Sequence, residues 1–129
     1  SGHETVFLVE DDPAIRSLNQ QILQSKGYRV LTASNGIEAI EKANAHSGKI
    51  DLLAIDVVMP KMDGYQAALK MCQIFPDMRV LYVSGYTRDV TMEHGVPGTG
   101  LNFMQKPFSP DQLLNRVREI LDSKSAARA

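Results

Sequence analysis

LLAIDVVMP, residues 52–60, is the segment around which the rest of the chain is organised. An uninterrupted apolar run of strand length, with its one charge near the end, predicts a central parallel strand that is buried on both faces. Pro60 cannot extend a sheet ladder and Asp63-Gly64 is typical of a turn, so we expect the strand to end just after Asp56. Ligands bind in the crevice at the carboxyl ends of parallel strands. Asp56 is therefore the first candidate for a functional residue.

Length and charge limit the organisation of the chain and its partners. Its 129 residues fit one domain, expected over 4–123, with Ser1-Gly2-His3 resembling a tag remnant and 124–129 forming a frayed tail. Fourteen basic and fifteen acidic residues give a net charge of -1, which favours neither nucleic acid nor an anionic membrane as a partner. One cysteine excludes an internal disulfide, and no apolar run reaches transmembrane length. We expect a cytoplasmic location without membrane contact, and a monomer or weak dimer.

Strand and helix patterns alternate along the whole chain. Besides the central strand, we expect strands over 5–9, 28–33, 79–84 and 101–105. Helices are expected from 13 up to Gly27 as the stop residue, over 35–45 and 65–75, and from 109 to about 122. A short or mobile helix is expected near 88–94, where several glycines follow. This order predicts an α/β fold in a single domain, with a doubly wound, five-stranded parallel sheet of the (βα)5, flavodoxin-like type.

Helical periodicity and start signals add detail to this fold. Asp12 is expected to cap the first helix ahead of Pro13, and Asn35 with Glu38 forms a start resembling a capping box. The residues predicted to share the inner face of their helix are Ile15, Leu18, Ile22 and Leu23 in the first, Ala68, Leu69 and Cys72 in the third, and Leu113, Leu114, Val117, Ile120 and Leu121 in the last.

Five polar residues are predicted to meet at one edge of the sheet: Glu10, Asp11, Asp56, Ser84 and Lys106. Three carboxylates at close range repel one another, and a hard divalent cation with oxygen ligands, Mg²⁺ above all, relieves that repulsion. Lys106 would add a positive charge and Ser84 a hydroxyl donor, as needed to hold a phosphoryl group. Asp56 would then be the nucleophile that forms an acyl phosphate.

Four segments carry a resemblance to the receiver domains of response regulators and hybrid histidine kinases in two-component signalling. They are VEDDP at 9–13, IDVVMP with DG at 55–64, VSG at 83–85 and KPF at 106–108. The resemblance implies that Asp56 accepts a phosphoryl group from the phosphohistidine of a histidine kinase or a histidine phosphotransfer domain. It also implies Mg²⁺ or Mn²⁺ bound by Asp11, Asp56 and, through water, Glu10. A backbone carbonyl just past Asp56, that of Val58, would complete the protein ligands.

The resemblance further implies a switch and a control on hydrolysis. Ser84 would move toward the phosphoryl group and the Phe103 ring would change rotamer with it, reshaping the face of the fourth helix, fifth strand and fifth helix. Lys106-Pro107 should be a cis peptide. Val58 and Tyr86, two residues beyond Asp56 and Ser84, would flank the approach of the hydrolytic water. The segments at 84–87 and 103–110 are most like receivers attached to sensor histidine kinases, so the parent protein is expected to be a hybrid kinase.

Three other functions share parts of this pattern. A flavodoxin-type cofactor module needs a phosphate-binding loop after the first strand, where Glu10-Asp11-Asp12 would repel phosphate. An aspartate phosphatase usually places a second carboxylic acid two residues after its nucleophile, and Val58 holds that position. A degenerate receiver that only docks partners would not need Ser84 and Lys106 together with the acidic pair. The isolated module is not expected to act as an enzyme beyond its own phosphorylation and dephosphorylation.

Overall fold

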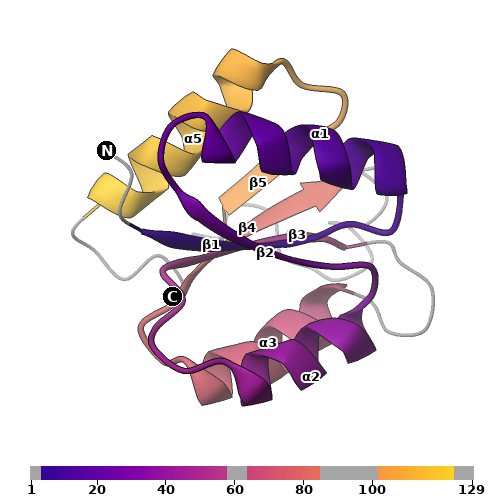
Figure 1. Cartoon of the computed structure of the whole chain (residues 1–129), viewed down its shortest axis with the longest axis vertical. Coiled ribbons are helices and arrows are strands. Elements are labelled where there is room, and N and C mark those ends of the chain that lie inside the picture. The colour runs from indigo at the N-terminus through magenta and orange to yellow at the C-terminus, as the bar shows by residue number, and fades with distance from the viewer. Residues whose placement is uncertain (1–3, 58–63, 85–101, 124–129) are drawn as a thin grey trace.

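A five-stranded parallel sheet forms the centre of the computed structural model, which describes residues 4–57, 64–84 and 102–123 (Figure 1). The strands lie in the order β2-β1-β3-β4-β5, so the chain winds outward in both directions from the middle of the sheet. Their bounds are β1 Thr5–Val9, β2 Arg29–Ala33, β3 Leu52–Asp56, β4 Arg79–Ser84 and β5 Asn102–Gln105. The doubly wound fold expected from the sequence is confirmed.

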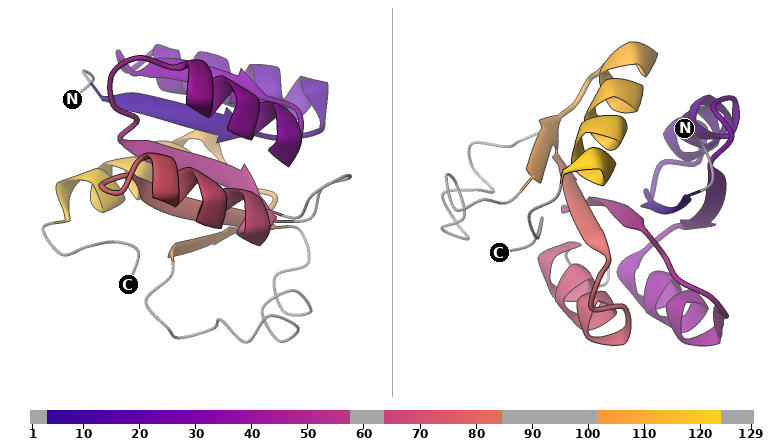
Figure 2. Two further views of the ribbon diagram at one scale, coloured as in Figure 1. Left: turned by 90° about the horizontal axis from the view of Figure 1, so that it is seen from below. Right: turned by 90° about the vertical axis from the view of Figure 1, so that its left-hand side faces the viewer.

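The helices cover both faces of this sheet. The described ones are α1 Pro13–Gln24, α2 Gly36–Ala45, α3 Gly64–Ile74 and α5 Pro110–Asp122. α1 and α5 lie on one face and α2 and α3 on the other, as Figure 1 and both views of Figure 2 show. The short helix expected near 88–94 lies outside the described residues. None of the described helices has the length and apolarity that crossing a membrane requires.

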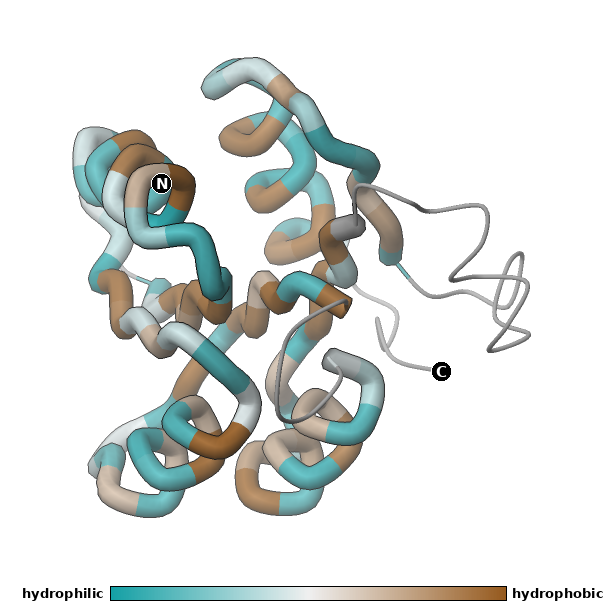
Figure 3. Tube along the Cα trace, turned by 90° about the vertical axis from the view of Figure 1, so that its right-hand side faces the viewer, coloured by the Kyte–Doolittle hydropathy of each residue, from teal (hydrophilic) through white to brown (hydrophobic). Residues whose placement is uncertain are grey.

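β3 supplies side chains to both cores, one on each side of the sheet. Leu52 packs with Val6, Leu23 and α5 on the face covered by α1 and α5. Leu53 and Ile55 pack on the opposite face, under α2 and α3. Hydrophobic residues gather in the strands between the two layers (Figure 3). Each fully buried leucine or isoleucine contributes about 1.5–3 kcal/mol, so this strand anchors both layers.

The helix starts agree with their sequence signals, with one difference. The Asp12 side chain accepts hydrogen bonds from the N–H groups of Ala14 and Ile15, and Ser109 caps α5 in a complete capping box. Asn35 caps α2 as expected. The Glu38 carboxylate, however, accepts from the N–H and hydroxyl of Ser34 instead of returning to Asn35.

Some predicted inner faces and helix ends were wrong. Leu18 is 55% exposed at the edge of the buried stripe of α1, and Leu69 is 65% exposed because α3 buries Gly64, Ala67, Ala68 and Met71 on the other side. Cys72 is half-buried. α1 ends at Gln24, three residues before Gly27, whose positive φ fits the predicted stop residue. α3 begins at Gly64 rather than Tyr65.

Candidate functional site

The acidic residues lie at the carboxyl ends of β1 and β3, which are neighbours in the sheet. Asp56 is the last residue of β3, and Glu10 follows the last residue of β1. The Glu10 N–H donates to the carbonyl of Ala33, and Arg16 donates to the Glu10 carbonyl at 2.7 Å. These two hydrogen bonds, to Ala33 of β2 and from Arg16 of α1, fix the backbone of Glu10 and so set the direction of its side chain.

Lys106 lies between two buried carboxylates. Its Nζ is 2.7 Å from Oε1 of Glu10 and 2.8 Å from Oδ2 of Asp56. The Glu10 and Asp56 side chains are 4% and 8% exposed, and that of Lys106 is 21% exposed. An ammonium group held at hydrogen-bond distance from both acids supplies the cation that such buried charges require. Lys106-Pro107 is a cis peptide bond, as expected.

Burial and this lysine act in opposite directions on Glu10. Burial raises the pKa of Glu10, although hydrogen bonds from Lys106 and from the Asp12 N–H lower it. Burial alone would lower the pKa of Lys106, but its hydrogen bonds to Asp56 and Glu10 outweigh burial and raise it. Lys106 is therefore fully charged at neutral pH and is a permanent positive charge at this edge.

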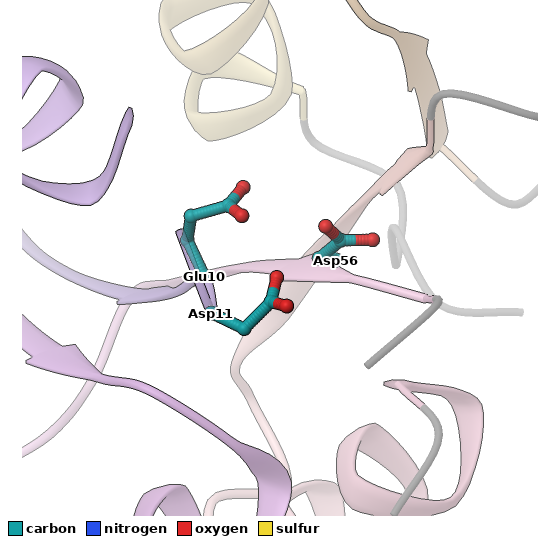
Figure 4. Close-up of side chains that lie close together, drawn as sticks. All are labelled: Glu10, Asp11 and Asp56. Carbon is teal, nitrogen blue, oxygen red and sulfur yellow. The ribbon is translucent and has the colours of Figure 1, made fainter. Parts of the chain in front are cut away.

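Three carboxylates form a set of ligand atoms suited to a hard cation. One oxygen each of Glu10, Asp11 and Asp56 lies within 4.8 Å of the others, and Figure 4 shows the three carboxyl groups around a common space. Glu10 and Asp56 are buried, whereas Asp11 is exposed. All-oxygen donors with an open, solvent-facing side fit Mg²⁺, which keeps several of its waters.

Gly64 places α3 directly against the backbone of Asp56. Its N–H donates to the carbonyl of Val57 at 3.0 Å. A Cβ at Gly64 would overlap the carbonyl oxygen of Asp56 and would lie 2.6 Å from Cα of Val57. The sequence indicated only a turn here. The glycine lets the first turn of α3 pack against the strand end that carries Asp56.

The remaining predicted residues are described in part. Ser84 is the last residue of β4, with its Cα aligned with that of Gln105, and its side chain lies outside the described set. Val58 and Tyr86 also lie outside the described residues. Phe103 is half-buried on β5, where its ring lies 5.6 Å from that of Tyr82. The structure thus brings together Glu10, Asp11, Asp56 and Lys106, and places Phe103 on a strand two positions away from β3.

Comparison with known proteins gives a family match over most of the chain. Residues 6–118 match the model of the response regulator receiver domain. Over 124 residues the chain is 39% identical to the sensor kinase CckA of Brucella abortus, covering 96% of this chain and 13% of CckA. It is 30% identical over 118 residues to the chemotaxis protein CheY of Bacillus subtilis, covering 91% of this chain and 97% of CheY.

Solved structures of receiver domains and response regulators are also similar to this chain. The receiver domain of the hybrid histidine kinase CckA superposes with a TM-score of 0.78 at 35% identity, covering 92% of this chain and 99% of that domain. The response regulator TrrA of Thermotoga maritima, in complex with Mg²⁺-BeF, gives a TM-score of 0.74 at 27% identity, covering 91% and 98%. The chain spans 13% of the length of CckA and about half that of two Bacillus subtilis regulatory proteins, YbdJ and PhoP.

Proposed function

Because this chain belongs to the response regulator receiver domain family of two-component signalling, we propose that Asp56 accepts a phosphoryl group from a phosphohistidine. The observation that carries the proposal is the placement of Asp56. It ends the central strand, its Oδ2 lies 2.8 Å from Nζ of Lys106, and two further carboxylates stand beside it. An aspartate that only capped a turn would not need to be buried beside the ammonium group of Lys106, the residue that follows β5.

The chemistry is a transfer between two nucleophiles. An oxygen of Asp56 forms a bond to phosphorus as the bond from phosphorus to the histidine nitrogen breaks, and that nitrogen regains its electron pair. Lys106 is placed to pair with a phosphoryl oxygen once the charge of Asp56 is shared with phosphate. Because Lys106 also bonds Glu10, it remains anchored at the site when Asp56 is modified.

The carboxylates of Glu10, Asp11 and Asp56 would hold Mg²⁺ or Mn²⁺. Asp11 and Asp56 would bind it directly, Glu10 through water, and the Val58 carbonyl would be a further ligand. A divalent cation there neutralises the carboxylates and so admits an anionic phosphoryl group. The likeness to TrrA, whose structure contains Mg²⁺-BeF, supports this assignment.

Phosphorylation would be read through a switch at β4 and β5. Ser84, at the end of β4, would bond the phosphoryl group, and Phe103 would change position with it. The face of residues 88–94, β5 and α5 would be reshaped. Val58 and Tyr86 would limit the access of water to the acyl phosphate and make it comparatively long-lived.

The partner would be a histidine kinase or a histidine phosphotransfer domain. The sequence identity of 39% to the CckA sensor kinase, and of 35% to the solved receiver domain of the hybrid histidine kinase CckA, supports a hybrid kinase as the parent protein. Within that parent the module would not be an enzyme, since it would catalyse only its own phosphorylation and dephosphorylation.

The test is phosphorylation by a small phosphodonor such as acetyl phosphate, with Mg²⁺ and with excess chelator, followed by intact mass. We expect one phosphoryl group per chain with Mg²⁺ only, and none in Asp56→Asn. The matched control is Asp12→Asn, because Asp12 caps α1 and asparagine caps equally well. Incorporation that survives Asp56→Asn, or is undiminished in chelator, would show that the site is wrongly assigned.

A further inference from the structure

Three aromatic rings from three elements form a cluster beside the phospho-acceptor. Tyr65 comes from the first turn of α3, Tyr82 from β4 and Phe103 from β5. The ring centroids of Tyr65 and Tyr82 are 4.8 Å apart, those of Tyr82 and Phe103 5.6 Å, and those of Tyr65 and Phe103 6.2 Å. Each ring thus touches both others at distances typical of tilted aromatic pairs. We call these three residues the aromatic cluster.

One side of the aromatic cluster rests on the strand that carries Asp56. Tyr82 is aligned with Phe103 across β4 and β5, and with Ile55 across β3 and β4. Ile55 directly precedes Asp56, so the cluster lies one row below the acidic edge of the sheet. Tyr82 is buried, and it packs in the same core as Ile55 on the face covered by α2 and α3.

The other side of the cluster touches the phospho-acceptor through α3. Gly64, next to Tyr65, bonds the Val57 carbonyl and leaves no room for a Cβ against the Asp56 carbonyl. A displacement of the Asp56 backbone therefore moves the first turn of α3, and with it the ring of Tyr65. Tightly packed groups transmit small shifts because the packing has no free space to absorb them.

We propose that Tyr65 and Tyr82 are positioning residues that link Phe103 to the first turn of α3, so that phosphorylation of Asp56 also changes the layer formed by α2 and α3. This rests on the proposed function, because it needs a phosphoryl group on Asp56. It adds a second connection, through Gly64 and Tyr65, to the one expected through Ser84. A movement of Phe103 removes ring contacts that hold Tyr65, so the first turn of α3 loses packing contacts.

The test uses beryllofluoride with Mg²⁺ as the phosphoryl mimic and amide exchange as the readout. Exchange is measured for α3, for β5 and for β2, which lies at the opposite edge of the sheet from β5. Three variants are compared with the parent chain: Tyr65→Phe keeps the ring, Tyr65→Leu removes it, and Tyr28→Leu removes a buried tyrosine ring from the other core. Thermal stabilisation by the mimic shows in each variant whether it binds.

We expect the mimic to change the exchange rates of both α3 and β5 in the parent, in Tyr65→Phe and in Tyr28→Leu, and those of β2 in none. The change in α3 should be about fivefold, the ratio that corresponds to one aromatic pair. In Tyr65→Leu the mimic should still bind and still change β5, but the response of α3 should disappear.

Two results would overturn the linkage alone: an α3 that does not respond in the parent although the mimic binds, or a full α3 response in Tyr65→Leu. Failure of the mimic to stabilise the parent chain would instead reject the proposed function, and the linkage with it. A response lost equally in Tyr65→Leu and Tyr28→Leu would also overturn the proposal, because it would reflect general weakening of the core.

Discussion

Lys106 is the residue on which the electrostatics of the site depend. It bonds two carboxylates that are almost fully buried, and its removal would take away the positive charge that both of them contact. The sequence suggested that a metal ion must relieve the repulsion at this edge. In the structure the lysine already relieves part of it, since it contacts both acids in the described part of the chain.

Replacing Lys106 by methionine should therefore destabilise the metal-free protein strongly. Breaking a buried ion pair by removing one partner costs about 3–5 kcal/mol. We expect a loss near the lower end, because Lys106 is itself partly exposed, and we expect Mg²⁺ to restore more stability to Lys106→Met than it adds to the parent. The measurement is urea unfolding in chelator and in Mg²⁺.

Lys42→Met is the matched control for this change. Lys42 pairs with Glu38 at 3.1 Å, but the two side chains are 47% and 35% exposed, so its loss should cost less than about 1 kcal/mol. Equal destabilisation of the two variants would mean that Lys106 contributes only as an ordinary surface lysine.

Tyr82 gives the molecule a defined sensitivity to alkaline pH. Burial, with a smaller contribution from the charge of Cys72, raises the pKa of Tyr82 from 10.0 to about 12. The folded state then keeps a proton that the unfolded chain loses, so the stability from this group is complete below pH 10 and is lost as the pH rises through 12.

The comparison is between the parent and Tyr82→Phe, in denaturant unfolding between pH 9 and pH 12. The parent should lose about 2 kcal/mol more than the variant over this range, since a phenylalanine has no proton to lose. Parallel pH profiles would show that the Tyr82 hydroxyl ionises as easily in the folded protein as in the unfolded one.

At the scale of elements, α3 packs directly against the backbone of Asp56 at the end of β3. Gly64→Ala would force a methyl group into the carbonyl of Asp56. Overpacking of this kind typically costs about 1–3 kcal/mol, and here part of the strain must move the strand end itself. We expect lower stability together with slower phosphorylation by acetyl phosphate.

Gly48→Ala separates these two effects. Gly48 has a φ of +93°, so alanine is strained there, but the position lies in the loop before β3 and the nearest atom to an added Cβ is 4.0 Å away. This variant should lose stability and keep the parent rate of phosphorylation. A Gly64→Ala protein with the parent rate would mean that α3 does not help to position Asp56.

Elements whose signals are local could be predicted from the sequence. The apolar run of β3, the caps Asp12 and Ser109, and the glycine that stops α1 each depend on residues close in the chain. The acidic edge could also be predicted, because the carboxyl ends of all strands of a parallel sheet lie at the same side. Nothing in such patterns gives distances between elements, so the bonding of Lys106 to Glu10 was not foreseen.

The errors came from features that tertiary packing decides. Leu69 has the hydrophobicity of a core residue, but α3 turns its glycine and alanine face inward because the helix approaches β3 closely. The sequence around Gly64 indicates only a turn, because the close approach of α3 to β3 is a tertiary contact. Glu38 is an exception, because its contact is local: its carboxylate accepts hydrogen bonds from Ser34 instead of returning to Asn35, and these hydrogen bonds lower its pKa to about 2.

At the scale of the whole molecule, a long-range ion pair joins the first strand to the last helix. Arg118 on α5 bonds Glu4 at the start of β1 at 2.8 Å, and it also bonds the hydroxyl of Tyr28. These contacts close the layer of α1 and α5 at the edge of the sheet opposite the acidic site. The ion pair of Arg118 with Glu4 and the acidic residues with Lys106 therefore lie at opposite ends of the same strands.

Binding of a cation at the site should nevertheless appear in the stability of the whole molecule. A ligand that binds only the folded state stabilises it by about 1.4 kcal/mol at ten times its dissociation constant. For a domain of this size that corresponds to a rise of roughly 5 °C in melting temperature. We expect this rise with Mg²⁺ in the parent chain.

Asp11→Asn tests whether the acidic set is the origin of that rise. Lys106 contacts Glu10 and Asp56, so in the described part of the chain Asp11 adds a negative charge that this lysine does not bind. Removing its charge should raise the melting temperature slightly in chelator and abolish the rise with Mg²⁺, because one direct ligand is lost. Asp12→Asn should keep the full rise, since its side chain bonds the first N–H groups of α1. If Asp11→Asn melts below the parent in chelator, Asp11 stabilises the local backbone and the crowding of carboxylates is not what the cation relieves.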